Sequence, residues 1–173
     1  ARYCDHGNIA AMRVPLETAH LMGAKAVVLA SVAGSLRPEL RPGAMVVIRD
    51  HMSFSGQSPL VGMPHTPVCD MSLAYDPILR ERLHLAGSEI GRKLVDGVYW
   101  WQPGPQFETP AEVAAARMLG GDVIGLSLNP ETLIARHLGM RVLAFTMVTN
   151  FAAGLSDETI TRTSLRTVAT GSP

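Results

Sequence analysis

Charged residues are scarce in this sequence. They make up 17% of its 173 residues, and 15 Lys and Arg residues are balanced by 15 Asp and Glu residues, so the formal net charge is +0. Without a basic excess, the sequence does not predict nucleic acid as a partner. For a globular protein, so low a content of charged residues favours an oligomer, in which part of the surface is buried between subunits.

Cysteine is also nearly absent. The two cysteines, Cys4 and Cys69, lack the spacing of metal ligands, and the six histidines form no HxxxH group. We therefore expect no metal and no disulfide, which is typical of a cytoplasmic protein. Long apolar runs are missing too, because Gly, Pro and charged residues interrupt them before they reach the length of a membrane span. No signal peptide is visible, although the sequence starts at Ala1 rather than Met.

The chain does contain a regular alternation of apolar runs and helical patterns, punctuated by 16 Gly and 12 Pro residues. This alternation predicts a three-layer α/β fold in one domain spanning 1–173, with a mainly parallel mixed sheet flanked by helices. The expected strands are 26–31, 44–48, 95–101, 123–127 and 141–148, and the expected helices are 8–21, 76–86, 109–119, 130–138 and 157–169. A polar loop rich in Gly and Pro, 53–67, is long enough to predict a functional or interface loop.

The stretch 100–112 (WWQPGPQFETPAE) carries the first chemical signal. An apolar strand stops at a Pro-Gly-Pro turn, a helix starts at Pro110, and Glu108 lies between them. In an α/β protein the loop that leaves the carboxyl end of a strand is where ligands bind, and a carboxylate there can accept hydrogen bonds from a flat N–H edge. The alternative is that Glu108 belongs to the helix start. However, Thr109 as N-cap with Pro110 as the first helical residue leaves Glu108 outside the helix.

Three more loops fall at strand ends and complement this carboxylate. The small-residue turn 32–36 offers backbone N–H groups to an anion, the loop 127–129 offers the Ser127 hydroxyl, and the loop 149–151 offers the Asn150 amide. By the strand-end rule all four loops line one pocket, suited to a ligand with an anionic part and a flat polar ring. The alternative for Ser127 and Asn150 is that each satisfies only local backbone groups.

Taken together, these segments resemble the trimeric, 6-oxopurine-specific class of purine nucleoside phosphorylases. The resemblance covers nearly the whole chain, and its most specific part is GPQFETPAE at 104–112. The other matching segments are AGSLRP at 33–38, RDH at 49–51, SGQSPLVG at 55–62, AYD at 74–76, GDVIGLS at 121–127, PE at 130–131, ARH at 135–137 and TNFAAGLS at 149–156. The resemblance implies the nucleoside phosphorylase fold without the family's first strand and last helix, to which nothing here corresponds.

For the base, the resemblance implies that Glu108 accepts the purine N1–H and that Asn150 bonds the O6/N7 edge. Phe107 would stack on the purine, and Ala33 and Gly34 would line the same half of the pocket. Such a polar site rejects a purine with the wrong edge by a factor of roughly 10⁴. Glu108 and Asn150 are also the residues to which the resemblance assigns catalysis.

For the co-substrate, the resemblance implies that the Val32 backbone N–H and the Ser127 hydroxyl hold inorganic phosphate, and that no cofactor takes part. Arg2 falls where the family has a phosphate-side histidine, and its permanent charge also suits an anion. The implied reaction is phosphorolysis, in which the bond to the base loosens first and phosphate then attacks an oxocarbenium-like sugar. Asn150 would strengthen its bond as charge develops on the departing purine.

The ribose half departs most from the family. Leu126 replaces a methionine under the ribose, Cys4 falls on a ribose-contacting tyrosine, and Arg162 falls where a histidine for the 5′-hydroxyl is expected. The base half therefore keeps the family's pattern, whereas the phosphate and sugar halves are changed.

The leading hypothesis is an enzyme of purine salvage, which releases hypoxanthine or guanine from a nucleoside with the help of phosphate. Two alternatives stay open at this point. One is a non-catalytic relative that acts as a purine-binding or assembly subunit, and the other is a hydrolase in which water replaces phosphate. A dinucleotide oxidoreductase is disfavoured, because no GxGxxG follows a first strand.

Overall fold

The structure is a computed structural model that describes residues 3–63, 68–157 and 168. Its helices are α1 (Tyr3–His6), the 3₁₀ helix η1 (Ala10–Met12), α2 (Arg13–Leu21), α3 (Pro77–Glu89), α4 (Pro110–Met118) and α5 (Asn129–His137). Its strands are β1 (Ala26–Ser35), β2 (Met45–Met52), β3 (Val95–Trp101), β4 (Val123–Gly125) and β5 (Arg141–Phe151). Every predicted element up to residue 151 is present, whereas the helix predicted for 157–169 lies outside the described residues apart from its first position and Val168.

Two helices begin where their sequences predict a cap. Asp76 caps α3 by accepting from the Leu79 N–H at 2.9 Å. Thr109 caps α4, with Glu112 completing a reciprocal capping box through the Thr109 N–H at 2.7 Å. These two starts therefore follow from a few neighbouring residues.

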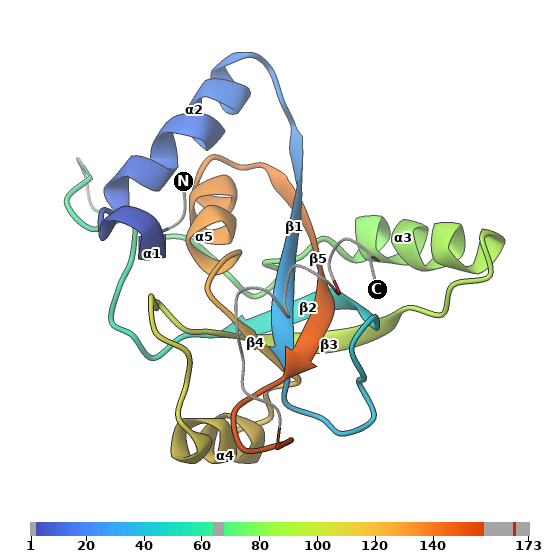
Figure 1. The fold of residues 1–173 in the computed structure, drawn as a ribbon. Coiled ribbons are helices and arrows are strands. Elements are labelled where there is room, and N and C mark those ends of the chain that lie inside the picture. Colours follow the sequence, from blue (N-terminus) through green and yellow to red (C-terminus); the bar gives the residue numbers. More distant parts are fainter. Residues whose placement is uncertain (1–2, 64–67, 158–167, 169–173) are drawn as a thin grey trace.

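The five strands form one mixed sheet that closes on itself in the order β1-β4-β3-β2-β5 (Figure 1). The pairs β1–β5, β2–β3 and β3–β4 are parallel, and the pairs β1–β4 and β2–β5 are antiparallel. The mainly parallel mixed sheet is therefore confirmed. Its closure was not predicted, and it leaves each of the five strands paired on both sides along part of its length.

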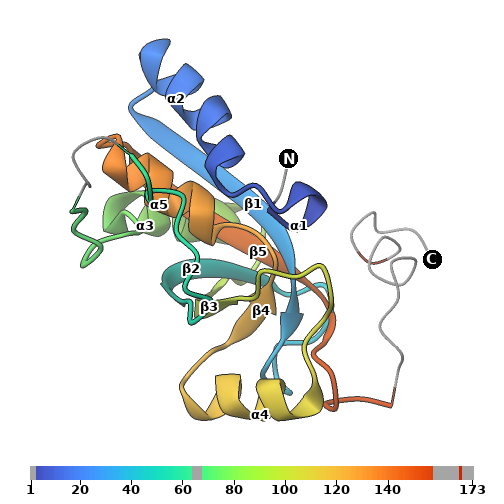
Figure 2. The same ribbon diagram turned by 90° about the vertical axis from the view of Figure 1, so that its left-hand side faces the viewer.

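Helices flank this sheet on more than one side, as predicted. In Figure 1, α2 and α5 lie together on one side of β1 and β5, and α3 lies on the other. Figure 2 shows α4 apart from these helices, at the end of the sheet where β1 and β5 finish. A large cluster of buried hydrophobic residues fills the interior of the sheet and the interface between the sheet and the helices. A smaller cluster packs α4 against the sheet and consists of Leu36, Val113, Ala116, Ile124 and Ala152.

Two of the predicted strand-end loops are wrong in detail. The segment 32–36 is not a small-residue turn, because β1 continues to Ser35 and pairs with β5 along its length. The two strands shift register between Ala33 and Gly34, as at a β-bulge. Likewise β5 continues to Phe151, so Asn150 lies on a strand rather than in a loop. The described part of the predicted loop, 53–63, contains neither helix nor strand, and its functional or interface role stays a prediction.

Among the described residues, no helix is both long enough and apolar enough to cross a membrane.

Candidate active site

One cavity of about 200 Å³ brings the predicted site residues together. It is lined by Asp5, Val32, Ala33, Gly34, Pro105, Phe107, Glu108, Ile124, Gly125, Leu126, Ser127, Thr149 and Asn150. Eight of these were predicted from the sequence. Of the remaining predictions, Arg2 and Arg162 lie outside the described residues, as does the side chain of Cys4, so their roles stay predictions.

The cavity lies where strands of opposite direction meet, not along one common edge of a parallel sheet. The carboxyl ends of β1 and β5 arrive from one direction, and the segments that follow β3 and β4 arrive from the other. The two groups join where Gly34 pairs with Ile124 and Ser35 pairs with Val123. The strand-end rule thus identified residues that do line one cavity, although the sheet geometry behind it is different.

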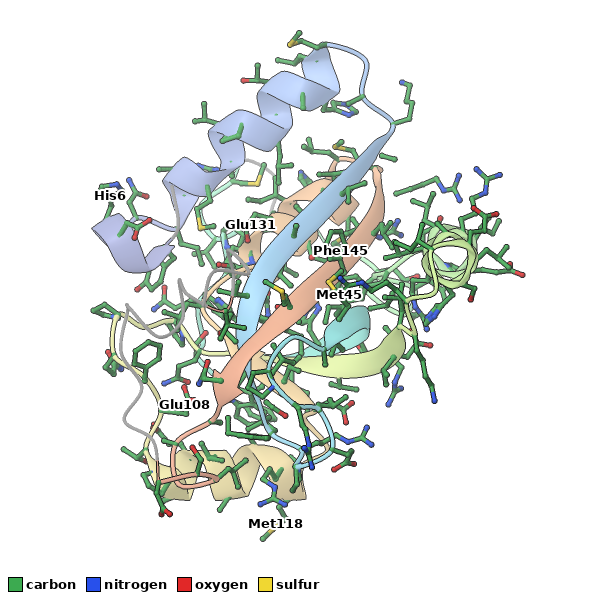
Figure 3. All side chains as sticks on the ribbon, turned by 45° about the vertical axis from the view of Figure 1, so that its right-hand side comes forward. His6, Met45, Glu108, Met118, Glu131 and Phe145 are labelled. Atoms are coloured by element: carbon green, nitrogen blue, oxygen red, sulfur yellow. The ribbon has the colours of Figure 1, made fainter. Side chains whose placement is uncertain are left out.

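Glu108 lies just before the start of α4, beside the ends of β1 and β5 (Figure 3). Only 7% of its surface is exposed. This burial raises the pKa of the Glu108 carboxyl, while a hydrogen bond with the Ala153 backbone opposes the rise. The helix cap is made by Thr109 and Glu112, so the alternative in which Glu108 serves the helix start is wrong. A buried carboxylate on a cavity wall is a strong acceptor for a ligand N–H.

Two hydrogen bonds fix the orientation of the Asn150 amide. The Thr149 hydroxyl donates to Asn150 Oδ1 at 2.9 Å, and Asn150 Nδ2 donates to the Phe151 carbonyl at 2.7 Å. One N–H and one lone pair of the amide then remain for a ligand. Local hydrogen bonds, the alternative given above, therefore use only half of the hydrogen-bonding positions of the Asn150 amide.

Gly34 allows the Asn150 amide to lie close to β1. A Cβ atom at position 34 would lie 3.2 Å from Asn150 Nδ2 and 3.4 Å from the Ile124 side chain. The contact with Asn150 is tighter than ordinary van der Waals contact, so a side chain at position 34 would push the amide aside by a few tenths of an ångström, and the glycine preserves the amide position. Gly34 thus has a steric role beside Asn150 in the cavity.

Val32 and Ser127, the two residues expected to hold an anion, also line the cavity. Val32 is 41% exposed, although it lies within β1 and not in the predicted turn. The Ser127 hydroxyl has no hydrogen-bond partner among the described residues. Its backbone N–H, however, donates to the Tyr99 hydroxyl at 3.2 Å. Among the described residues the Ser127 hydroxyl therefore satisfies no local backbone group, in contrast to the alternative given above.

The sequence analysis did not assign a role to five cavity residues. Among these five, Asp5 and Thr149 have polar side chains. Asp5 comes from α1 and brings a second carboxylate to the cavity. Thr149 is buried and orients Asn150 from the neighbouring position on β5. Adjacency to Asn150 was the only signal available for Thr149. No group of three His, Cys, Asp or Glu side chains that could hold a metal occurs in the part of the chain that the structure describes.

These features define an α/β protein with a small-molecule site, in which a buried carboxylate and an oriented amide line one cavity at the ends of a closed mixed sheet. The chain belongs to the phosphorylase superfamily, whose family model matches residues 5–171.

The chain is similar to known purine nucleoside phosphorylases. It is 40% identical over 158 residues to the purine nucleoside phosphorylase of Mycobacterium leprae, an alignment that covers 91% of this chain and 56% of the relative. A Schistosoma purine nucleoside phosphorylase solved in complex with hypoxanthine superposes with a TM-score of 0.91 and 31% identity, covering 99% of this chain and 64% of that one. The Schistosoma mansoni enzyme in complex with inosine gives a TM-score of 0.92 and 30% identity, with 99% and 65% covered. The chain thus spans about half the length of the curated relatives it matches.

Proposed function

We propose that this chain carries the substrate site of an enzyme that cleaves 6-oxopurine nucleosides with phosphate, giving the free purine and ribose 1-phosphate. The observation that supports this most is the pairing of Glu108 and Asn150 on the walls of one cavity. The similarity to purine nucleoside phosphorylases solved with hypoxanthine and with inosine supports the same substrate class.

The two side chains match the edge of a 6-oxopurine. Its N1–H is a donor, which the buried Glu108 carboxylate accepts, and its O6 is an acceptor for the N–H of Asn150 that the protein leaves unused. A 6-aminopurine reverses both groups, so each would face a partner of the same kind. The half-exposed ring of Phe107 is available to stack on the purine.

In the proposed reaction an oxygen of phosphate forms a bond to C1′ of the ribose as the bond from C1′ to N9 of the purine breaks. The electron pair of that bond leaves with the purine and spreads towards N7 and O6. The Asn150 amide then donates to a more negative atom than in the ground state, which lowers the barrier. Val32 and Ser127 would hold the phosphate, and Leu126 would lie against the ribose.

The remaining features of the proposal follow the family resemblance. Inorganic phosphate is the only co-substrate, with no metal or organic cofactor. The low content of charged residues supports a homo-oligomer, a trimer by resemblance. We place the protein in the cytoplasm, where purine salvage takes place.

Purine release from inosine, measured with and without phosphate, tests the proposal. We expect release only with phosphate, and little release from adenosine under the same conditions. Release in both conditions would identify a hydrolase instead. If no purine is released while hypoxanthine still binds in a calorimetric titration, the chain is a purine-binding protein without this activity.

A further inference from the structure

The hydroxyl of Tyr99 lies beneath the part of the cavity that contains Ser127. Tyr99 is on β3, is 0% exposed, and belongs to the main hydrophobic cluster. Its hydroxyl accepts the Ser127 backbone N–H at 3.2 Å. A Cβ atom at position 125 would overlap this hydroxyl. The glycine at this position therefore allows the Tyr99 hydroxyl to reach the Ser127 N–H.

Two further hydroxyl groups of the sheet lie near Tyr99. Ser31 on β1 interacts with the Tyr99 side chain, and Ser31 Oγ donates to Thr146 Oγ1 on β5 at 3.0 Å. The Tyr99 oxygen accepts the Ser127 N–H, which ties this core hydroxyl to the segment that follows β4.

The backbone just after Ser127 is strained. Leu128 has φ 72° and ψ −49°, and among the described residues it is the only non-glycine residue with a positive φ. The Asn129 N–H donates to the Ser127 carbonyl at 2.9 Å, which closes a three-residue γ-turn of the rare, strained kind. Such a conformation persists only where the surroundings hold it, and Leu128 is 2% exposed.

We propose that Tyr99 is a positioning residue, whose hydroxyl together with the strained turn at Leu128 holds Ser127 so that its side-chain hydroxyl points to the anion. The two backbone polar groups of Ser127 are then fixed from opposite sides, the N–H by Tyr99 and the carbonyl by Asn129. Only its side-chain hydroxyl remains for a ligand. The identity of the anion as phosphate rests on the proposed function, whereas the positioning of Ser127 does not.

The test is Tyr99→Phe, which removes the hydroxyl and leaves the buried ring in place. Tyr75→Phe is the matched control, since Tyr75 is equally buried and its hydroxyl bonds His51 Nδ1 at 2.9 Å, away from the cavity. Two quantities are measured in the whole chain: hydrogen exchange of the Ser127 amide by NMR, and the KM values for phosphate and for inosine.

For Tyr99→Phe we expect the Ser127 amide to exchange about tenfold faster and the KM for phosphate to rise about fivefold to tenfold, as loss of one buried hydrogen bond predicts. The KM for inosine should change by less than about twofold, because the base half of the site is untouched. Tyr75→Phe should leave all three quantities at their wild-type values.

The proposal is overturned if the Ser127 amide of Tyr99→Phe exchanges at the same rate as in the wild type. It is also overturned if Tyr75→Phe raises the KM for phosphate as much as Tyr99→Phe does. If the wild-type chain releases purine without phosphate, the proposed phosphorolysis fails on its own. The exchange rate of Ser127 still decides whether Tyr99 positions it.

Discussion

Replacing Glu108 with Gln should make the free protein more stable and the purine complex weaker. The substitution keeps the size of the side chain and removes its charge. In the free protein that charge is unfavourable, because Glu108 is 7% exposed and burial raises the pKa of its carboxyl. In the complex the same charge becomes favourable, because it accepts a hydrogen bond from the purine N1–H.

The two effects differ in sign and in size. Removing a buried carboxylate charge that is only partly compensated should raise the free energy of unfolding by about 1 kcal/mol near pH 7. For a chain of this length that corresponds to a rise in Tm of about 2–4 °C. Losing a hydrogen bond to a charged group costs about 1.5–3 kcal/mol, which weakens hypoxanthine binding about 10-fold to 150-fold.

The pH dependence follows from the raised pKa of Glu108. When the pKa of a carboxyl is higher in the folded state than in the unfolded state, the folded state loses stability as pH rises through these two pKa values. The stability gain of Glu108→Gln should therefore be absent at acid pH, where both states carry a neutral carboxyl, and should appear as pH rises. Hypoxanthine binding to the wild type should weaken as pH falls through the same range.

Thermal unfolding at several pH values and calorimetric titration with hypoxanthine measure the two effects. Glu112→Gln is the matched control, since Glu112 lies in the same segment but serves the capping box of α4. It should lower stability by about 0.5 kcal/mol and leave the affinity unchanged. Unchanged hypoxanthine affinity in Glu108→Gln would refute Glu108 as the acceptor of the purine N1–H.

Two further predictions concern hydrogen bonds on β5. Thr149→Val should weaken hypoxanthine binding about threefold to tenfold in calorimetric titrations, because the Asn150 amide loses the bond that orients it, and Thr149→Ser should restore the affinity. Equal affinities for Val and Ser would argue against this role. Asp76→Asn should lower the urea-unfolding free energy by about 1 kcal/mol at pH 7, because Arg141 lowers the pKa of Asp76 to about 2. Since this stabilisation is lost as pH falls towards that value, the difference should narrow below pH 4; a difference that is constant from pH 7 to pH 3 would exclude the ion pair as its cause.

The sequence predicted best those features that depend on neighbouring residues. The start of α4 needs only residues within four positions of one another. The structure places Thr109 and Pro110 in their expected roles and adds Glu112, which completes the capping box. The bounds of β3, Val95–Trp101, also match the prediction, because a Pro-Gly-Pro turn ends the strand. Glu108 could be recognised for the same reason, since the local cap shows that it is not part of the helix.

Features that depend on distant pairing were missed or misread. The small residues at 32–36 indicated a turn, yet β1 continues there because β5, more than 100 residues later, provides a partner strand. Small side chains serve two purposes that a single sequence does not distinguish, positive-φ turns and close approach between chains. At Gly34 it is close approach, with the Asn150 amide as the neighbour.

Tyr99 shows why the support of a site is harder to predict than its ligand-binding groups. Ligand groups lie at strand ends, where polar side chains interrupt apolar runs and can be recognised. Tyr99 lies within an apolar strand, and its ring packs like any core residue while its hydroxyl alone reaches Ser127. The strained turn at Leu128 has no sequence signal either, because leucine is among the residues least expected at a positive φ. The closed sheet brings β1, β3 and β5 together at this point, so the position of Ser127 depends on the whole fold rather than on its own loop.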